Sequence, residues 1–124
     1  MLRKDYDALC RKVDELMEKF HATKDDYGAY YIETPCGKLR VAVSEFVRGK
    51  RYNYWIYTRI ENPEKVIENI RKLKNFNEFN GKFNECSDNI QYLISWLSCY
   101  LNDLLYPFPS GFRRIPDGIY MGEH

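Results

Sequence analysis

Cysteine and histidine are the residues of this sequence best suited to nucleophilic or metal chemistry. A histidine beside a cysteine can take the thiol proton and activate the thiolate, so Cys36 with His21 would give a thiol enzyme. No sequence signature accompanies this pair. The alternative is a solvated histidine at a helix end, with cysteines that pack as small apolar residues. We expect this second arrangement, in which Cys36, placed in a hairpin turn, would be the most exposed thiol.

The sequence lacks the ligand spacing that metal and cofactor sites need. Structural zinc sites present closely spaced ligand pairs, and the sequence has no CxxC pair. The adjacent carboxylates Asp25 and Asp26 fall in a loop, where solvated charge is the usual state. Gly37 and Gly49 are isolated turn glycines, so no glycine-rich phosphate loop follows a strand. The sequence therefore predicts no catalytic residue, no metal site and no cofactor.

Aromatic and basic residues gather in residues 48–59, which read RGKRYNYWIYTR. Between residues 38 and 60 there are six basic residues against one acid, Glu45. An aromatic surface with cationic edges can stack nucleic-acid bases while arginines hold phosphates. Trp, Tyr and Arg also dominate the hot spots of protein interfaces. The candidate binding residues are Tyr31, Arg40, Arg48, Lys50, Arg51, Trp55, Tyr57 and Arg59.

A helix and three strands must position these residues. Apolar residues recur at helical spacing over residues 2–21, which predicts an amphipathic first helix. Strands are predicted at 27–34, 38–47 and 51–60, because each run is rich in aromatic and β-branched residues. The two connections between these strands are short and contain glycine, which indicates hairpins.

Two-residue turns at Cys36-Gly37 and Gly49-Lys50 would set the register of the three strands. Side chains alternate along a strand, so one sheet face becomes apolar and the other aromatic and charged. The apolar rows contain Leu39, Val41, Val43 and Ile56. The opposite face has Glu33, Arg40 and Arg59 in one row, followed by rows with Tyr31, Tyr57 and Trp55. In the alternative to a binding role, the C-terminal arm or a second protomer covers this face, and Glu33 pairs with both arginines.

A short helix, a short strand and a long helix are predicted after the third strand. Asn62-Pro63 is a helix start, with asparagine as the N-cap and proline in the first helical position. Asn80-Gly81 favours a short strand or hairpin across residues 76–86. Ser87 or Asp88 is expected to cap the long final helix.

These elements predict an α+β fold, a two-layer sandwich of order α-β-β-β-α-β(β)-α with a three-stranded antiparallel meander and a long C-terminal helix. The first and last helices are expected to cover the apolar sheet face. Residues 1–106 would form one domain. Residues 107–124 would form a C-terminal arm that contains proline and glycine.

The element order resembles that of the double-stranded-RNA-binding domain. That family carries a lysine cluster at the start of its last helix, where this chain has Glu85, Ser87 and Asp88. The order also resembles that of type III secretion chaperones, which are usually acidic. No motif is shared with either family, so neither resemblance assigns a role to a residue.

The length and the net charge of the chain limit the classes of function that it can have. A chain of 124 residues has a one-domain length, and a net charge of +1 argues against a protein that lives wholly on nucleic acid or a membrane. The sequence shows neither a signal-peptide core nor an apolar stretch of about 20 residues, so we expect a cytoplasmic protein with reduced thiols. The aromatic strand at 27–34 has an edge that invites pairing with a second copy, which makes a homodimer an alternative state.

We therefore predict a small cytoplasmic, non-enzymatic protein that binds another protein through its sheet and basic hairpin. Heavy use of Lys, Asn, Ile, Tyr and Phe indicates an AT-rich genome. An inhibitor or adaptor of the kind that phages and mobile elements carry is one such role. The first alternative is a nucleic-acid-binding module that uses the basic and aromatic sheet face, and the second is the thiol enzyme of Cys36 and His21.

Overall fold

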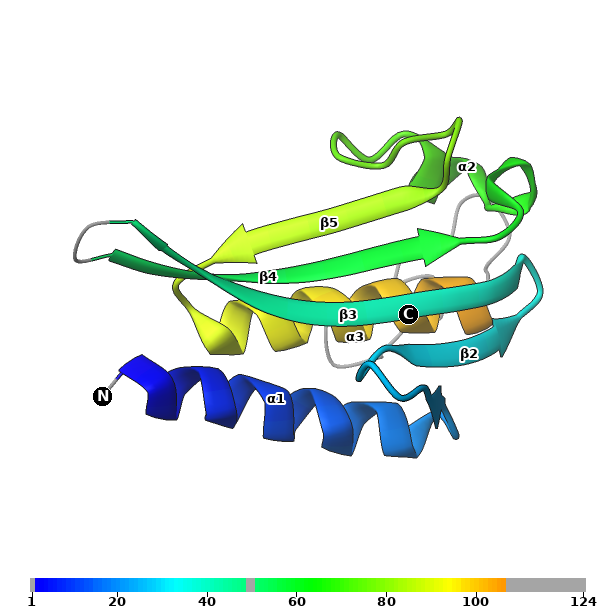
Figure 1. The fold of residues 1–124 in the computed structure, drawn as a ribbon. Coiled ribbons are helices and arrows are strands. Elements are labelled where there is room, and N and C mark those ends of the chain that lie inside the picture. Colours follow the sequence, from blue (N-terminus) through cyan, green and yellow to red (C-terminus); the bar gives the residue numbers. More distant parts are fainter. Residues whose placement is uncertain (1, 49–50, 107–124) are drawn as a thin grey trace, which may run out of the picture.

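The chain forms a five-stranded antiparallel sheet with two long helices on one side (Figure 1). The computed structural model describes residues 2–48 and 51–106. In chain order the elements are α1 (Leu2–Lys19), β1 (Thr23–Lys24), β2 (Tyr30–Thr34), β3 (Gly37–Arg48), β4 (Arg51–Ile60), the 3-10 helix η1 (Pro63–Lys65), α2 (Glu68–Arg71), β5 (Lys82–Ser87) and α3 (Ile90–Leu105). The strands follow one another across the sheet as a meander. The predicted α+β fold is confirmed, while the predicted arm at 107–124 lies outside the described residues.

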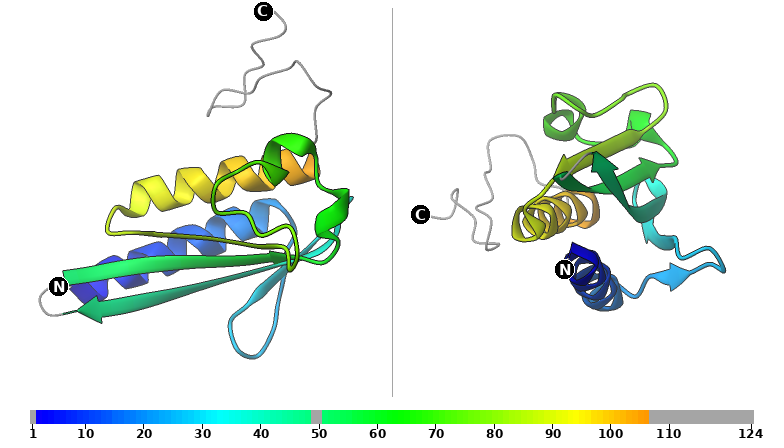
Figure 2. Two further views of the ribbon diagram at one scale, coloured as in Figure 1. Left: turned by 90° about the horizontal axis from the view of Figure 1, so that it is seen from above. Right: turned by 60° about the vertical axis from the view of Figure 1, so that its left-hand side comes forward.

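The two long helices pack side by side on the same face of the sheet (Figures 1 and 2). Each helix carries an apolar stripe, and burying that stripe against an apolar sheet face removes both surfaces from water. On the sheet side, Leu39, Val41 and Ile56 are fully buried, as predicted. The helices contribute Leu9, Val13, Leu16, Met17, Leu93, Leu97, Tyr100, Leu101 and Leu104.

The hairpin of β3 and β4 has the predicted register. Leu39 lies opposite Ile60, and Arg40 lies opposite Arg59. Because side chains alternate along each strand, Ile56 and Ile60 point into the core, whereas Arg59 points to the opposite face of the sheet. We call this opposite face, on which no described helix packs, the open face. It contains Tyr31, Arg40, Ala42, Trp55, Tyr57, Arg59, Lys82 and Asn84.

The first hairpin reverses at Pro35-Cys36, one residue before the predicted Cys36-Gly37 turn, so the predicted turn is wrong. The Thr34 side chain accounts for this position. Its Oγ1 donates to the Gly37 carbonyl at 2.7 Å and accepts from the Cys36 N–H at 3.0 Å. Gly37 has a φ of 92°, which a residue without Cβ adopts readily, and it becomes the first residue of β3.

This earlier turn moves every pair between β2 and β3 by two residues. Tyr31 lies opposite Arg40 instead of Ala42, and Glu33 lies opposite Lys38 instead of Arg40. A shift of two residues preserves the alternation, so each β2 side chain stays on its predicted face. The cross-strand neighbours of each β2 side chain, however, differ from the predicted ones.

An additional two-residue strand, β1, lies at the sheet edge next to β2. It pairs Thr23 with Tyr31 and Lys24 with Tyr30, so the strand expected to offer an edge to a second copy is already paired there. The Asp25 carboxylate accepts hydrogen bonds from the N–H groups of Tyr27 and Ala29, both at 2.9 Å. These bonds hold residues 25–29 as a loop, and β2 therefore begins at residue 30.

The strand predicted within residues 76–86 is β5, which pairs with β4 and places Lys82 opposite Arg59. The Gly81 N–H donates to the Asn77 carbonyl at 2.8 Å and closes the turn before the strand. Phe76 pairs with Phe83 as an isolated bridge, so a hairpin forms at this one position only.

Two helix starts differ from the predicted ones. Asn62 makes no side-chain cap, and Pro63 begins a single 3-10 turn, after which α2 starts with Ile67 as its N-cap. Helix α3 is capped by Asn89, whose Oδ1 accepts from the Tyr92 N–H at 3.1 Å. Ser87 cannot take that role because it still belongs to β5.

A glycine pair tests how tightly the turn before β5 is packed. Gly81 has a φ of 75°, and a Cβ added there would collide with the backbone carbonyl of Ile60, whereas Gly28 has a φ of 88° and open space around it. Gly28→Ala should lose about 1–2 kcal/mol of unfolding free energy through backbone strain alone. Gly81→Ala should lose clearly more, because the strand pairing must also shift. Urea unfolding of both variants measures the difference, and equal losses would contradict this packing.

Candidate functional site

The described residues do not support the thiol-enzyme arrangement. Cys36 is only 6% exposed, so its prediction as the most exposed thiol is wrong. The turn that contains it folds against the segment before η1, where the Asn62 N–H donates to the Cys36 carbonyl at 2.9 Å. Burial raises the pKa of the Cys36 thiol, and a thiol that stays protonated is a poor nucleophile. His21 is exposed at the end of α1 with a φ of 57°.

All four cysteines are free. Burial also raises the pKa of Cys10 and Cys86, so these thiols are not activated either. Within residues 2–48 and 51–106, no cluster of three or more His, Cys, Asp or Glu side chains could hold a metal ion.

The main feature of the open face is a row of three cations on adjacent strands. Arg40 of β3 lies opposite Arg59 of β4, which lies opposite Lys82 of β5. Neighbouring strands are about 4.8 Å apart, so the backbone positions that carry the three positive side chains lie in one short row across the sheet. We call Arg40, Arg59 and Lys82 the cation row. None of the three forms an ion pair with a residue that the structure describes.

The alternative in which Glu33 pairs with Arg40 and Arg59 is wrong. The two-residue shift of β2 carries Glu33 away from the arginines and places its carboxylate 3.8 Å from the Lys38 ammonium. Tyr31 takes its place beside Arg40. On the other side, β5 adds Lys82, which no sequence motif marks as a site residue. The row is therefore more positive than the sequence predicts.

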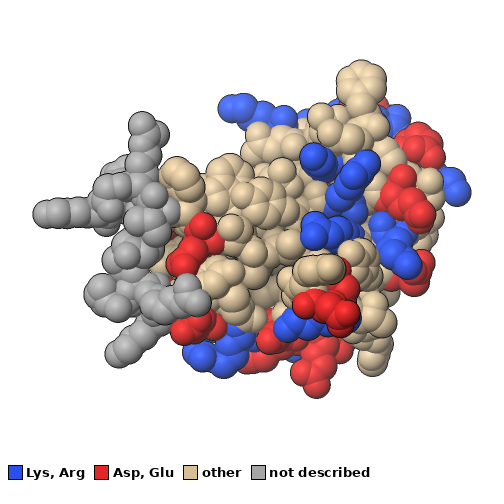
Figure 3. Space-filling model, in the orientation of Figure 1, with Lys and Arg blue, Asp and Glu red and all other residues tan. Residues whose placement is uncertain are grey.

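A hollow of about 430 Å³ lies at the cation row, lined by Arg40, Tyr57, Thr58, Arg59, Lys82 and Asn84. Arg59 is held in place, since its Nε donates to the Asn80 carbonyl at 3.3 Å. Asn84 is also oriented, since its Oδ1 accepts from the Thr58 N–H at 3.1 Å. Figure 3 shows Lys and Arg atoms gathered over the right-hand ends of the central strands, beside an uncharged surface.

Trp55 and Tyr57 form a stacked pair next to the hollow. Their ring centroids are 5.5 Å apart and their planes differ by 4°. Tyr57 keeps 37% of its surface exposed, while Trp55 is half-buried. The pair follows from the i, i+2 spacing of the two residues on one strand face, which the sequence predicts. It provides a flat aromatic surface beside the cations.

Tyr31 makes its described contacts at the sheet edge and does not line the hollow. Its hydroxyl donates to Asp25 Oδ2 at 3.0 Å, and the Lys38 ammonium lies 5.9 Å from its ring centroid. The hydrogen bond connects β2 to the 25–29 loop, and the contact with Lys38 lies between β2 and β3.

The structure thus brings together Arg40, Trp55, Tyr57 and Arg59 of the predicted site residues. The side chains of Arg48, Lys50 and Arg51, also predicted, lie outside the described part of the molecule. Lys82 and Asn84 are site residues that sequence reasoning misses. The Asn80-Gly81 turn directly before them was the available signal, because it fixes where β5 begins.

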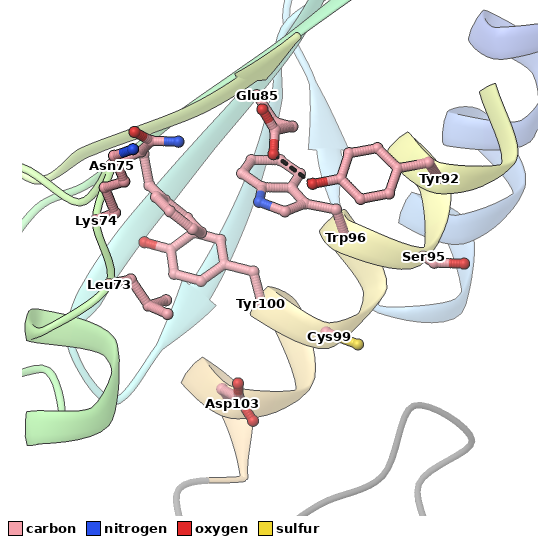
Figure 4. A pocket seen from close by; sticks show the side chains of 11 residues that line it. Leu73, Lys74, Asn75, Glu85, Tyr92, Ser95, Trp96, Cys99, Tyr100 and Asp103 are labelled. Carbon is pink, nitrogen blue, oxygen red and sulfur yellow. Dashed lines mark hydrogen bonds between the residues drawn. The ribbon is translucent and has the colours of Figure 1, made fainter. Parts of the chain in front are cut away.

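A second, apolar cavity of about 490 Å³ lies between α3, β5 and residues 73–75 (Figure 4). Trp96 and Tyr100 of α3 and Phe83 of β5 provide its aromatic walls. The Tyr92 hydroxyl donates to Glu85 Oε2 at 2.6 Å, and this bond raises the pKa of Tyr92. Burial raises the pKa of Tyr100 as well. The lining of this cavity is mainly aromatic and apolar, and neither tyrosine hydroxyl is shifted toward ionisation.

Comparison of the chain with protein-family models, with curated proteins and with solved structures finds no match. None of the described helices has the length and apolar character needed to cross a membrane. The case for a function therefore depends on the open face itself.

The loop that anchors Tyr31 generates a pH prediction. Hydrogen bonds from the Ala29 N–H, then from the Tyr27 N–H and the Tyr31 hydroxyl, lower the pKa of Asp25, and the positive charge of Arg40 lowers it further. A carboxylate with a depressed pKa stabilises the fold above its unfolded pKa of about 3.9, and this contribution is lost as the pH falls through the folded value. Asp25→Ala should therefore lower the melting temperature at pH 7 and cost progressively less below pH 4.

Asp26→Ala is the matched control, because Asp26 is an exposed neighbour that accepts none of these three bonds. Thermal unfolding from pH 7 to pH 2.5 gives both profiles. A deficit for Asp25→Ala that is constant over this range would contradict the assigned role of the carboxylate.

Proposed function

We propose that the protein is a non-enzymatic binding protein whose open sheet face binds single-stranded nucleic acid. The observation that carries this proposal is the cation row, three positive side chains in register, none of which forms an ion pair with a residue that the structure describes. Phosphates neutralise such charges, and binding releases the counterions that the phosphates otherwise hold. The stacked Trp55–Tyr57 pair beside the row supplies a flat surface for bases.

Single strands fit this surface better than a duplex does. Base stacking on aromatic side chains requires bases whose faces are accessible, and a duplex hides them. The row spans three strands, or about 10 Å, which limits the contact to a few phosphates. A small footprint agrees with the modest net charge of +1, since a protein covering long stretches of nucleic acid would carry more.

Salt dependence tests the proposal directly. Three phosphate contacts on a single strand predict a log–log slope of affinity against salt of about −2, and Arg59→Gln should make it shallower by about 0.7. Lys72→Gln is the matched control, because Lys72 lies on the surface after α2 and pairs with Glu68 at 3.4 Å. Fluorescence anisotropy with a mixed-sequence single-stranded oligonucleotide gives the slopes. No binding at 50 mM salt, or equal slopes for both variants, would refute nucleic-acid binding.

The second candidate function is binding of another protein, as an inhibitor or adaptor in the cytoplasm. The composition of the same surface favours it, because Trp, Tyr and Arg are the residues enriched in interface hot spots. Trp55, Tyr57 and Arg59 lie together on one strand face. The cation row would then meet an acidic patch of the partner.

Affinity purification after nuclease treatment separates the two candidates. A protein partner of the open face should be retained by the wild-type chain and lost with Arg59→Ala, while both proteins keep the same melting temperature. Tyr92→Ala is the aromatic control on α3, in the opposite layer. A protein that all three baits retain equally does not bind this face and would argue against the second candidate.

A further inference from the structure

The hollow at the cation row is lined mainly by hydrogen-bond donors. Arginine and lysine side chains carry donors and no acceptors. Asn84 uses its Oδ1 for the Thr58 N–H, so the donors on its Nδ2 remain for a ligand. The remaining acceptors among the lining side chains are the hydroxyls of Tyr57 and Thr58, and the Thr58 hydroxyl is buried and donates to the Phe83 carbonyl at 2.5 Å. A group with several negative oxygens matches this lining.

One face of the Tyr57 ring borders the same hollow. Residues 55, 57 and 59 follow one another on the open face of β4, and Trp55 covers one side of the Tyr57 ring in a parallel stack. Tyr57 and Arg59 both line the hollow, so the ring face that Trp55 leaves uncovered is the one that we assign to a ligand. A planar group seated there would stack on Tyr57 and extend the existing stack by one ring.

We propose that this hollow is a site for one nucleotide unit, with the phosphate on the cation row and Asn84 Nδ2, and the base stacked on Tyr57. The inference rests on the proposed nucleic-acid function for its ligand class and adds which residues hold which part. The hollow of about 430 Å³ falls within the usual range for small-ligand sites, about 300–1,000 Å³. No covalent step is involved.

The site is organised before a ligand arrives. The Arg59 side chain is restricted by its exposed hydrogen bond of 3.3 Å to the Asn80 carbonyl, and the Asn84 amide is oriented by the Thr58 N–H. The backbones that carry Arg40, Arg59 and Lys82 are held by the sheet ladder. Groups that are already in place lose little conformational freedom on binding, which favours even a small ligand.

Binding of adenosine 5′-monophosphate, adenosine and inorganic phosphate, followed by amide chemical shifts, tests the site. The monophosphate should bind more tightly than either of its parts and shift the amides around residues 57–59 and 82–84. Lys82→Gln should weaken both phosphate ligands about tenfold, since a charged hydrogen bond contributes about 1.5 kcal/mol or more. Tyr57→Leu should weaken the monophosphate about tenfold and leave inorganic phosphate unchanged.

Arg40→Gln provides a second charge variant on a different strand, and Lys72→Gln is the control that should change nothing. Equal affinities for the monophosphate and inorganic phosphate would overturn the base contact. Monophosphate binding that both Lys82→Gln and Arg40→Gln leave intact would overturn the site. If the oligonucleotide binds but the monophosphate does not, the nucleotide site fails and the proposed function stands. If the monophosphate binds but the oligonucleotide does not, the nucleotide site stands and the proposed function fails.

Discussion

The antiparallel register of β3 and β4 is the constraint on which the rest of the molecule depends. It places Leu39, Val41 and Ile56 against the helices and Arg40, Tyr57 and Arg59 on the other face. A slip by one residue would exchange these sets and bury guanidinium groups in the core. The effective cost of burying an unpaired charge is several kcal/mol, comparable to the whole stability of a small domain. The core and the open face are therefore specified together.

The cation row is acceptable to the fold, although its three like charges repel one another. Two unit charges about 5 Å apart in water repel by about 1 kcal/mol, and salt reduces this further. The row thus costs the domain a small part of its stability, and the attraction between Arg40 and the Asp25 carboxylate offsets part of this cost. Positive side chains that repel one another on adjacent strands are expected where a bound ligand neutralises their charge. The same logic explains why the hollow is lined by donors.

The sheet edges show how side-chain hydrogen bonds override simple turn rules. Thr34 closes the first hairpin one residue early through its hydroxyl, and Asp25 closes a loop that leaves room for β1. Strand propensity cannot reveal either effect, because both depend on a single polar side chain meeting backbone groups. Cys36 is buried for a related reason, since its turn is held against the chain that follows β4. The long hairpin and the two helices were predictable because periodic apolar patterns over many residues specify them.

Alternation along β4 is a property of the sequence alone. It determines that Trp55, Tyr57 and Arg59 share one face and that the stacked pair can form. The residues beside that face across the strands were decided only in three dimensions. Glu33 lies opposite Lys38 instead of Arg40, and Lys82 lies opposite Arg59. Both differences arise because strand partners are set by turns and by distant chain segments. The direction of a side chain is a local property, whereas its cross-strand neighbours are not, and the charge of the open face depends on those neighbours.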